Sequence, residues 1–209
     1  MFQRLSPHRW QVSLGGAQRR AEGPPKRLTL NVGGAFPPTH PTTRLCLELL
    51  REVLTGGPVC RLLDLGCGAG VLGLAAAALG VPLVVAVDIA EQAVRATLMN
   101  ARRNGLTDSL LIAQGSTECL KTCFDLIAAN LPLDLQMDKT KELDRLAAPS
   151  GSLILSGFRD NRENLLMEVY EKLGWHRARR LAKDFRHPEL PADLSFTWVA
   201  WLLKRKPSL

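Results

Sequence analysis

Three glycines and one aspartate have the types and the spacing to bind a nucleoside. Gly66, Gly68 and Gly70 alternate in a short segment that starts at Asp64, and Asp88 follows 22 residues after Gly66. Glycine has no Cβ, so a ligand can come close to this backbone and the turn can adopt positive φ. A carboxylate at this distance along the chain can accept hydrogen bonds from ribose hydroxyls. The pattern therefore predicts a nucleoside site, although glycines at this spacing also occur where only tight packing is needed.

The residues around the glycines predict the elements that would position them. Residues 62–65 predict a buried strand, residues 71–79 a helix, and residues 81–88 a second strand that ends at Asp88. The start of the helix would present free N–H groups to a ligand. A strand, glycine turn, helix, strand and acid in this order form a nucleoside-binding βαβ unit.

The same alternation of helices and strands continues along the chain. Helices are predicted at 44–54, 90–103, 138–147 and 161–173, and further strands at 110–113, 124–129, 152–156, 175–181 and 195–203, with a loop at 184–193. Alternating elements that end in a hairpin favour an α/β fold. We expect a Rossmann-like, doubly wound and mostly parallel sheet with an antiparallel C-terminal strand.

The N-terminal residues predict an extension of this domain. Residues 11–14 and 28–32 each favour a short strand, and Gly23-Pro24-Pro25 predicts a break between them. The segment has too few apolar residues for a core of its own. We therefore expect a small hairpin at 1–30 and one larger domain at 31–209.

Composition narrows the class of protein. With 209 residues and 46% hydrophobic residues, the chain can form one large core. No run of eighteen apolar residues predicts a membrane span, and the first residues do not resemble a secretory signal. The five cysteines have no paired metal spacing. We expect reduced thiols, no metal site and a cytoplasmic location.

The net charge of +7 favours a polyanionic partner such as RNA or a ribosome. Basic residues concentrate in residues 1–30 and 171–187. A basic segment can also be a solvated face that binds nothing, so both interpretations stay open at this point.

Several segments together resemble a known family. The chain resembles the class I S-adenosylmethionine-dependent methyltransferases and, within them, the ribosomal protein L11 methyltransferases. The match covers roughly residues 28–203, and the Thr-His-Pro-Thr-Thr segment combined with the loop at Asn130 is its most specific part. The matching segments are 35–36 with 39–43 and 45–47, 64–72, 86–89 with 93–94, 100–101 and 104–105, 124–131, and 153–157.

The resemblance implies a seven-stranded methyltransferase domain at 31–209 with S-adenosylmethionine as cofactor. It implies that Asn130 orients the methyl acceptor. The cofactor-binding residues that it implies are Thr43, Asp64, Gly66, Gly68, Gly70, Asp88, Ile89 and Asn130. The residues that it places at the substrate entrance are Thr39, His40, Leu131 and Pro132.

Two features differ from the family pattern. Pro37-Pro38 stands where the family usually has a Gly-Thr-Gly run, which predicts a stiffer loop before the first long helix. Members of the family also carry a separate substrate-recognition domain ahead of the catalytic one. The first thirty residues are too few to supply it, so the identity of the acceptor stays open.

The implied chemistry is methyl transfer, for which the protein mainly positions and desolvates the reactants. The segment Asn130-Leu131-Pro132-Leu133 has no aromatic residue that could stack on a planar base, which favours an aliphatic amine. We therefore expect a protein that methylates lysine or amino groups of proteins. RNA methylation is the first alternative, and a non-catalytic cofactor-binding or assembly module is the second.

Overall fold

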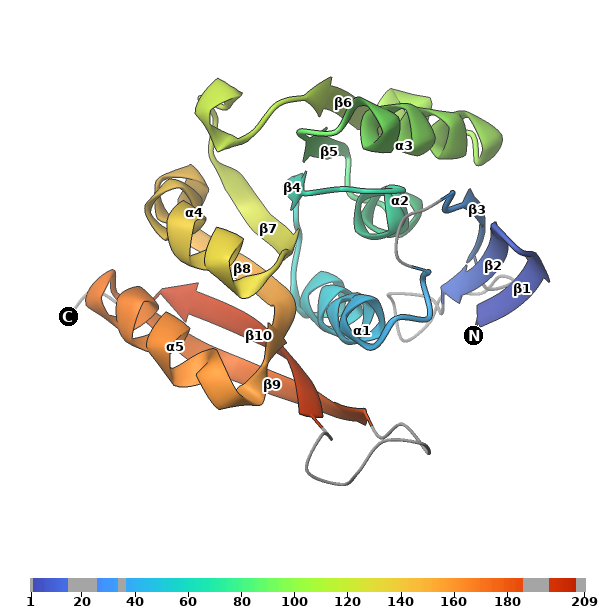
Figure 1. The fold of residues 1–209 in the computed structure, drawn as a ribbon. Helices are drawn as coiled ribbons and strands as arrows, with labels where there is room; N and C mark the ends of the chain where they lie inside the picture. Colours follow the sequence, from blue (N-terminus) through green and yellow to red (C-terminus); the bar gives the residue numbers. More distant parts are fainter. Residues whose placement is uncertain (1, 15–25, 34–36, 186–195, 206–209) are drawn as a thin grey trace.

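A seven-stranded sheet runs through the middle of the molecule (Figure 1). The computed structural model describes residues 2–14, 26–33, 37–185 and 196–205. The strand order is β6-β5-β4-β7-β8-β10-β9. The strands are β4 (Arg61–Leu65), β5 (Leu83–Asp88), β6 (Leu110–Gln114), β7 (Phe124–Asn130), β8 (Ala147–Arg159), β9 (Trp175–Phe185) and β10 (Phe196–Arg205).

The pairing of the strands confirms the predicted fold class. Strands β6, β5, β4, β7 and β8 are parallel, and β10 is antiparallel to both β8 and β9. The chain builds outward from β4 through β5 to β6 and then crosses to β7 on the other side of β4. Such a reversal opens a crevice beyond the carboxyl ends of the strands. The glycine turn follows β4, so it lies at this switch point.

Helices cover both faces of the sheet (Figure 1). One face carries α1 (Pro41–Gly56), α2 (Val71–Ala78) and α3 (Glu91–Arg103), and the other carries α4 (Leu133–Leu146) and α5 (Glu163–Lys172). Leu62 packs in the core on the side of α1 and α2, whereas Leu63 packs on the side of α4 and α5. Burial on both faces explains why the parallel strands are apolar throughout. Within the described ranges, no helix has both the length and the apolar character needed to cross a membrane.

Several element boundaries differ from those expected. Helix α1 begins at Pro41, because proline is well suited to the first turn of a helix. Helix α4 begins at Leu133, directly after Pro132, where Asp134 in the first turn is favourable to the helix dipole. Asp184 belongs to β9 and not to the expected loop. The rest of that loop, and the segment 35–36 of the family match, lie outside the described residues.

The N-terminal residues form a three-stranded antiparallel sheet of β1 (Phe2–Ser6), β2 (Arg9–Leu14) and β3 (Lys26–Asn31). Strands β2 and β3 pair, and β1 adds a strand that the sequence did not suggest. Val12 and Leu30 are buried in the same apolar cluster as residues of α1 and α2. The small sheet therefore shares the core of the larger domain, and the division at residue 30 stays a prediction.

Candidate functional site

A cavity of about 430 Å³ lies at the carboxyl end of β4, beside the glycine turn. It brings together five of the residues expected at the cofactor site, which are Thr43, Asp64, Gly66, Gly68 and Asn130. These residues come from α1, β4, the turn after β4 and the end of β7. The other lining residues are Pro37, Cys67, Ala69, Val71 and Leu72.

The end of β5 fixes the conformation of the glycine turn. The N–H groups of Gly66 and Cys67 both donate to the carbonyl oxygen of Val87, over 2.8 and 3.1 Å. The N–H of Gly68 donates to Oδ2 of Asp88 over 2.9 Å. A Cβ at Gly68 would have no neighbouring atom within 4 Å, so a ligand could approach the backbone there. The turn is thus held from one side and open on the other.

Asp88 is half-buried at the end of β5, next to the turn. Its second oxygen, Oδ1, accepts from the N–H of Ala90 over 2.9 Å. Each carboxylate oxygen can accept more than one hydrogen bond. The two backbone bonds therefore orient the carboxylate and leave it able to bind hydroxyl groups.

Three of the expected cofactor residues, Gly70, Asp88 and Ile89, lie outside the lining of the cavity, and Asp88 adjoins it through its bond to Gly68. Gly70 is the residue before α2, and a Cβ there would press against Thr97. Ile89 follows Asp88 and is 73% exposed. Thr97 was not singled out from the sequence, although its Oγ1 donates to the carbonyl oxygen of Gly68 over 3.0 Å. The signal for Thr97 that the sequence offered was a small polar residue on the inner side of α3.

Asp64 is almost fully buried beneath the turn. Burial raises the pKa of its carboxyl, the hydrogen bond from the N–H of Gly73 lowers it, and the negative charge of Asp88 raises it; the net result is a pKa of about 7. That bond is 2.8 Å long. Asp64 therefore ties the start of α2 to the end of β4, beside the cavity.

The pH dependence of stability tests this environment. The native pKa of about 7 lies above the ordinary 3.8, so between them the native protein keeps a proton that the unfolded chain has released. The contribution of Asp64 to the free energy of unfolding is fully present below the unfolded-state pKa of 3.8. It is lost as the pH rises through the native pKa of about 7. We expect the loss to reach about 4 kcal/mol in urea unfolding, and Asp64→Asn to lack it. Parallel curves for the two proteins would contradict the assignment.

Asn130 ends β7, and a buried glutamine holds the loop that follows it. The N–H of Leu131 donates to the carbonyl oxygen of Ser156 over 3.0 Å. Nε2 of Gln136 donates to the carbonyl oxygens of Ala129 and Ser156, over 2.7 and 3.0 Å. Gln136, a polar residue on the core-facing side of α4, was not singled out from the sequence. Its amide joins the ends of β7 and β8 and so positions Asn130.

The expected entrance residues lie near the start of α1 and the loop before α4, and none of them lines the cavity. Nδ1 of His40 is 2.8 Å from Oγ1 of Thr42. Partial burial lowers the pKa of His40, so its ring is neutral at pH 7. Thr39 and Leu131 are half-buried, and Pro132 is exposed.

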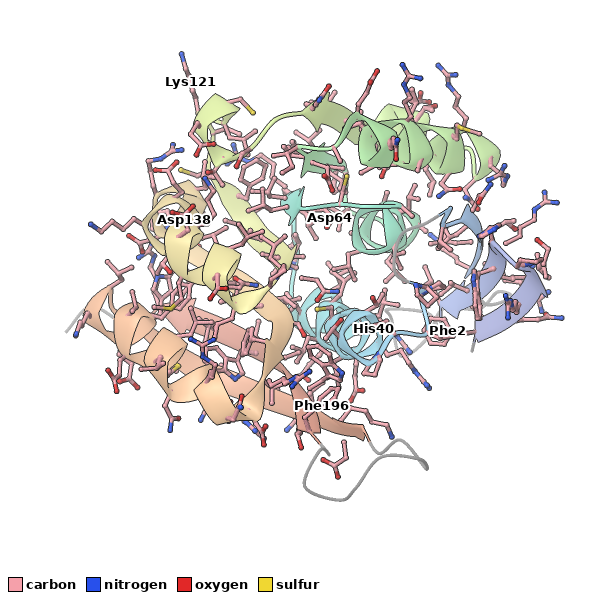
Figure 2. All side chains as sticks on the ribbon, in the orientation of Figure 1. Phe2, His40, Asp64, Lys121, Asp138 and Phe196 are labelled. Carbon is pink, nitrogen blue, oxygen red and sulfur yellow. The ribbon has the colours of Figure 1, made fainter. Side chains whose placement is uncertain are left out.

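Aromatic residues of β10 adjoin this entrance and were also missed. Trp198 packs edge-on against the ring of His40, with 5.3 Å between ring centroids. Figure 2 shows His40 at the start of α1 and Phe196 at the start of β10. The guanidinium of Arg159 lies 3.7 Å from the centroid of Phe196. The alternation at 195–203 predicted a strand but could not show that its first residues meet His40.

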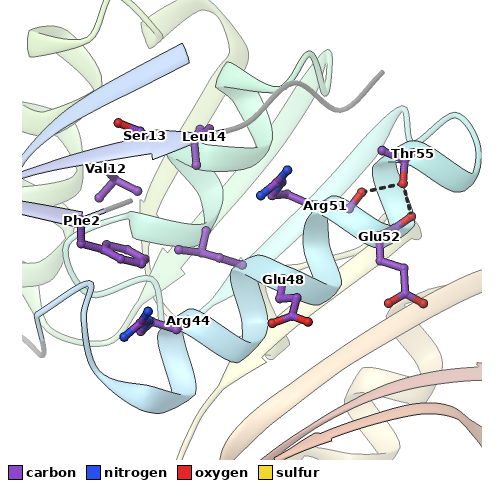
Figure 3. A pocket seen from close by; sticks show the side chains of 10 residues that line it. Phe2, Val12, Ser13, Leu14, Arg44, Glu48, Arg51, Glu52 and Thr55 are labelled. Carbon is purple, nitrogen blue, oxygen red and sulfur yellow. Dashed lines mark hydrogen bonds between the residues drawn. The ribbon is translucent and has the colours of Figure 1, made fainter. Parts of the chain in front are cut away.

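A second cavity, of about 510 Å³, lies between the N-terminal sheet and α1 (Figure 3). It contains none of the expected site residues, and its charged residues are of both signs. Its lining residues are Phe2, Val12, Ser13, Leu14, Arg44, Leu47, Glu48, Arg51, Glu52 and Thr55. This second cavity lacks a glycine turn and an oriented carboxylate. The cavity of about 430 Å³ beside the glycine turn is therefore the better candidate site. In the part of the chain that the structure describes, no group of His, Cys, Asp and Glu residues could hold a metal ion.

Comparisons with known proteins identify relatives of this chain. The sequence model of the ribosomal protein L11 methyltransferase (PrmA) family matches residues 18–184. A ribosomal protein L11 methyltransferase of Syntrophotalea carbinolica is 40% identical over 149 residues, which cover 70% of this chain and 48% of the relative. The chain thus spans about half the length of the curated relatives that it matches.

Solved structures show the same fold. A ribosomal protein L11 methylase from Lactobacillus delbrueckii subsp. bulgaricus has 26% identity and a TM-score of 0.71, covering 85% of this chain and 84% of that one. TYW2 of M. jannaschii in complex with AdoMet has 12% identity and a TM-score of 0.62, covering 86% and 83%. At that identity the second likeness concerns the fold alone.

Proposed function

Because the chain belongs to the ribosomal protein L11 methyltransferase family, we propose that it is an S-adenosylmethionine-dependent methyltransferase that N-methylates lysine or amino groups of a protein. The observation that carries the proposal is the cavity where the glycine turn after β4 meets Asn130, with Asp88 bonded to that turn. A ribosomal protein is the acceptor class that the family suggests. All five cysteines are free thiols, which supports a cytoplasmic location.

The residues of the cavity fit this cofactor. A volume of about 430 Å³ is of the size that small-molecule sites have. The space beyond Gly68 would admit a ligand close to the backbone. The carboxylate of Asp88 keeps acceptor capacity for the two ribose hydroxyls, and a bond to an ionised acceptor is stronger than a neutral one. Thr43 and Gly66 would line the methionine portion.

The cofactor supplies a methyl group on a sulfonium, and the acceptor must supply a lone pair. A lysine amine has an ordinary pKa of about 10.4, so it must lose its proton before it can react. Burial against Leu131 and Pro132 would lower the pKa of that amine. The side-chain oxygen of Asn130 would accept a hydrogen bond from the amine and aim its lone pair. His40, being neutral, would add no positive charge that repels a basic acceptor.

The charge distribution supports a protein acceptor over RNA. Arg177 and Arg180 of the basic segment both form ion pairs with Glu163, over 3.2 and 2.8 Å. Arg179 pairs with Glu52 over 3.5 Å. These three guanidinium groups are therefore partly neutralised within the protein, which weakens the case for a phosphate-binding surface on β9.

Labelled S-adenosylmethionine and a ribosomal extract test the proposed function. We expect label in a protein band that survives nuclease treatment. Label that disappears with nuclease would support RNA methylation, and the absence of binding at millimolar cofactor in calorimetry would contradict both forms of the enzyme.

Removing the side chain of Asn130 separates binding from transfer. We expect Asn130→Ala to lower the rate of methyl transfer by about 10²-fold, since one positioned polar group commonly contributes this much. The cofactor Kd should rise by a much smaller factor than the rate falls, because Asp88 and the glycine turn remain. Asn161→Ala, at an exposed position, is the matched control. Equal transfer rates for Asn130→Ala and the control would remove Asn130 from the mechanism.

A further inference from the structure

Two asparagines, Asn100 in α3 and Asn104 directly after its last residue, hold the free edge of strand β3. Oδ1 of Asn100 accepts from the N–H of Asn31 over 2.8 Å, and its Nδ2 donates to the carbonyl oxygen of Asn31 over 2.9 Å. Asn104 makes the same pair of bonds with Thr29, over 2.8 and 2.9 Å. Each amide therefore binds both backbone groups of one strand residue, as a neighbouring strand would.

The spacing of the two elements makes this match possible. Four residues of helix advance by about 6 Å, and two residues of strand advance by about 6.6 Å. Asn100 and Asn104, the residue that caps α3, are four apart, while Thr29 and Asn31 are two apart on one edge of β3. The other edge of β3 pairs with β2. Helix α3 thus closes the edge of the N-terminal sheet with side chains.

Asn100 makes one more contact, and it reaches the glycine turn. Its Nδ2 also donates to the carbonyl oxygen of Ala69 over 2.9 Å. Its Oδ1 accepts a second bond, from Nη1 of Arg103, over 2.9 Å. The side chain is fully buried, and all of its hydrogen-bonding capacity is used. Asn104 differs in its second donor hydrogen, which goes to the carbonyl oxygen of Asn100 over 2.7 Å and not to the turn.

We propose that Asn100 is a positioning residue that couples the N-terminal sheet to the cofactor turn, so that docking of the sheet tightens binding of S-adenosylmethionine. The inference deepens the proposed function and rests on it. Ala69 lies between Gly68, whose N–H is bonded to Asp88, and the first residues of α2. A shift of the Ala69 carbonyl would therefore move the segment that adjoins the ribose site.

The coupling follows from the shared amide. The two hydrogens of Nδ2 serve Asn31 and Ala69, so the position of one carbonyl constrains the other. If β3 leaves, Asn100 loses two of its four bonds and is free to turn. The carbonyl of Ala69 then loses its fixed donor, and a buried carbonyl without a partner favours a local rearrangement. By linkage, a ligand that fixes the turn must also favour the docked sheet.

The test compares Asn100→Ala with Asn104→Ala. The Asn104→Ala variant loses the same kind of bonds to β3, but its Asn100 still donates to the carbonyl oxygen of Ala69 in the turn. Calorimetry should give a cofactor Kd at least about 5-fold higher for Asn100→Ala and near the wild-type value for Asn104→Ala. In steady-state assays the KM for the cofactor should rise while kcat changes little. Hydrogen exchange of the ligand-free proteins should be faster at β3 in both variants, but faster at the turn only in Asn100→Ala.

Reciprocity gives a second measurement that needs no variant. Saturating S-adenosylmethionine should slow exchange of the Asn31 amide in the wild-type protein, and this holds even if Asn100→Ala fails to fold. Cofactor binding with unchanged exchange at Asn31, or equal Kd values for the two variants, overturns the coupling and leaves the proposed function standing. A wild-type protein that binds no cofactor overturns the proposed function and the coupling together.

Discussion

Asp88→Asn is expected to weaken binding of S-adenosylmethionine by about 10- to 100-fold with little change in the fold. The carboxylate would accept hydrogen bonds from two ribose hydroxyls, and a bond to a charged acceptor contributes about 1.5–3 kcal/mol. Asparagine keeps one acceptor oxygen for the N–H of Gly68 or of Ala90, but its amide hydrogens would face the other donor. The variant thus loses the charge that would bind the ribose and one bond that orients the carboxylate beside the turn, and both losses weaken binding of the ligand.

Calorimetry of Asp88→Asn and of the control Asp108→Asn checks this expectation. Asp108 is exposed in the short helix Thr107–Ser109, so its loss of charge should leave the Kd unchanged. Thermal unfolding of both variants reports on the fold. An unchanged Kd for Asp88→Asn would remove the ribose contact from the mechanism, and with it the main support for the cofactor site.

Gly157→Ala is expected to reduce methyl transfer by about 10²-fold or more, because it displaces the loop at Asn130. Gly157 has φ of +100°, and a Cβ there would lie 2.6 Å from the carbonyl carbon of Leu131 and closer still to its oxygen. The obstacle is backbone, which cannot rotate away. Either β8 or the segment at Leu131 must shift, and a displacement near 1 Å at a reacting group can cost this much in rate.

Gly174→Ala separates the clash from the backbone strain. Gly174 also has positive φ, +83°, but a Cβ there would have nothing within 4 Å. We expect it to lose about 1–2 kcal/mol of stability, from the conformation alone, and to keep its activity. Gly157→Ala should lose about 1–3 kcal/mol more, from the overlap with Leu131. Comparable activity in the two variants, measured after urea unfolding has established that both fold, would contradict a positioning role for this contact.

The charge on the C-terminal segment shows why composition alone leaves a partner open. The sequence counts Arg177, Arg179 and Arg180 as a basic run. In the structure all three form ion pairs, two of them with Glu163 at the start of α5. A count of charges along the chain cannot reveal partners that packing brings from other elements.

The glycine turn, Asp88 and Asn130 were accessible from the sequence because each follows its own strand in a regular alternation. Parallel strands of one sheet end at the same edge, so residues at their ends converge without any knowledge of side-chain contacts. Periodicity along one element reports which side is buried, and that was enough for the order of helices and strands. The family resemblance added the cofactor to this frame.

Gln136, Trp198 and Asn100 were beyond that reasoning because their roles depend on contacts between distant segments. The bonds from Asn100 to Asn31 join residues 69 apart in the chain, and Trp198 meets His40 from the far end of the sequence. Local patterns identify a polar side chain on an inner face but not the carbonyl that it will bind. That partner is chosen by how helices and strands pack, which is why the supports of the site, unlike its outline, emerged only in three dimensions.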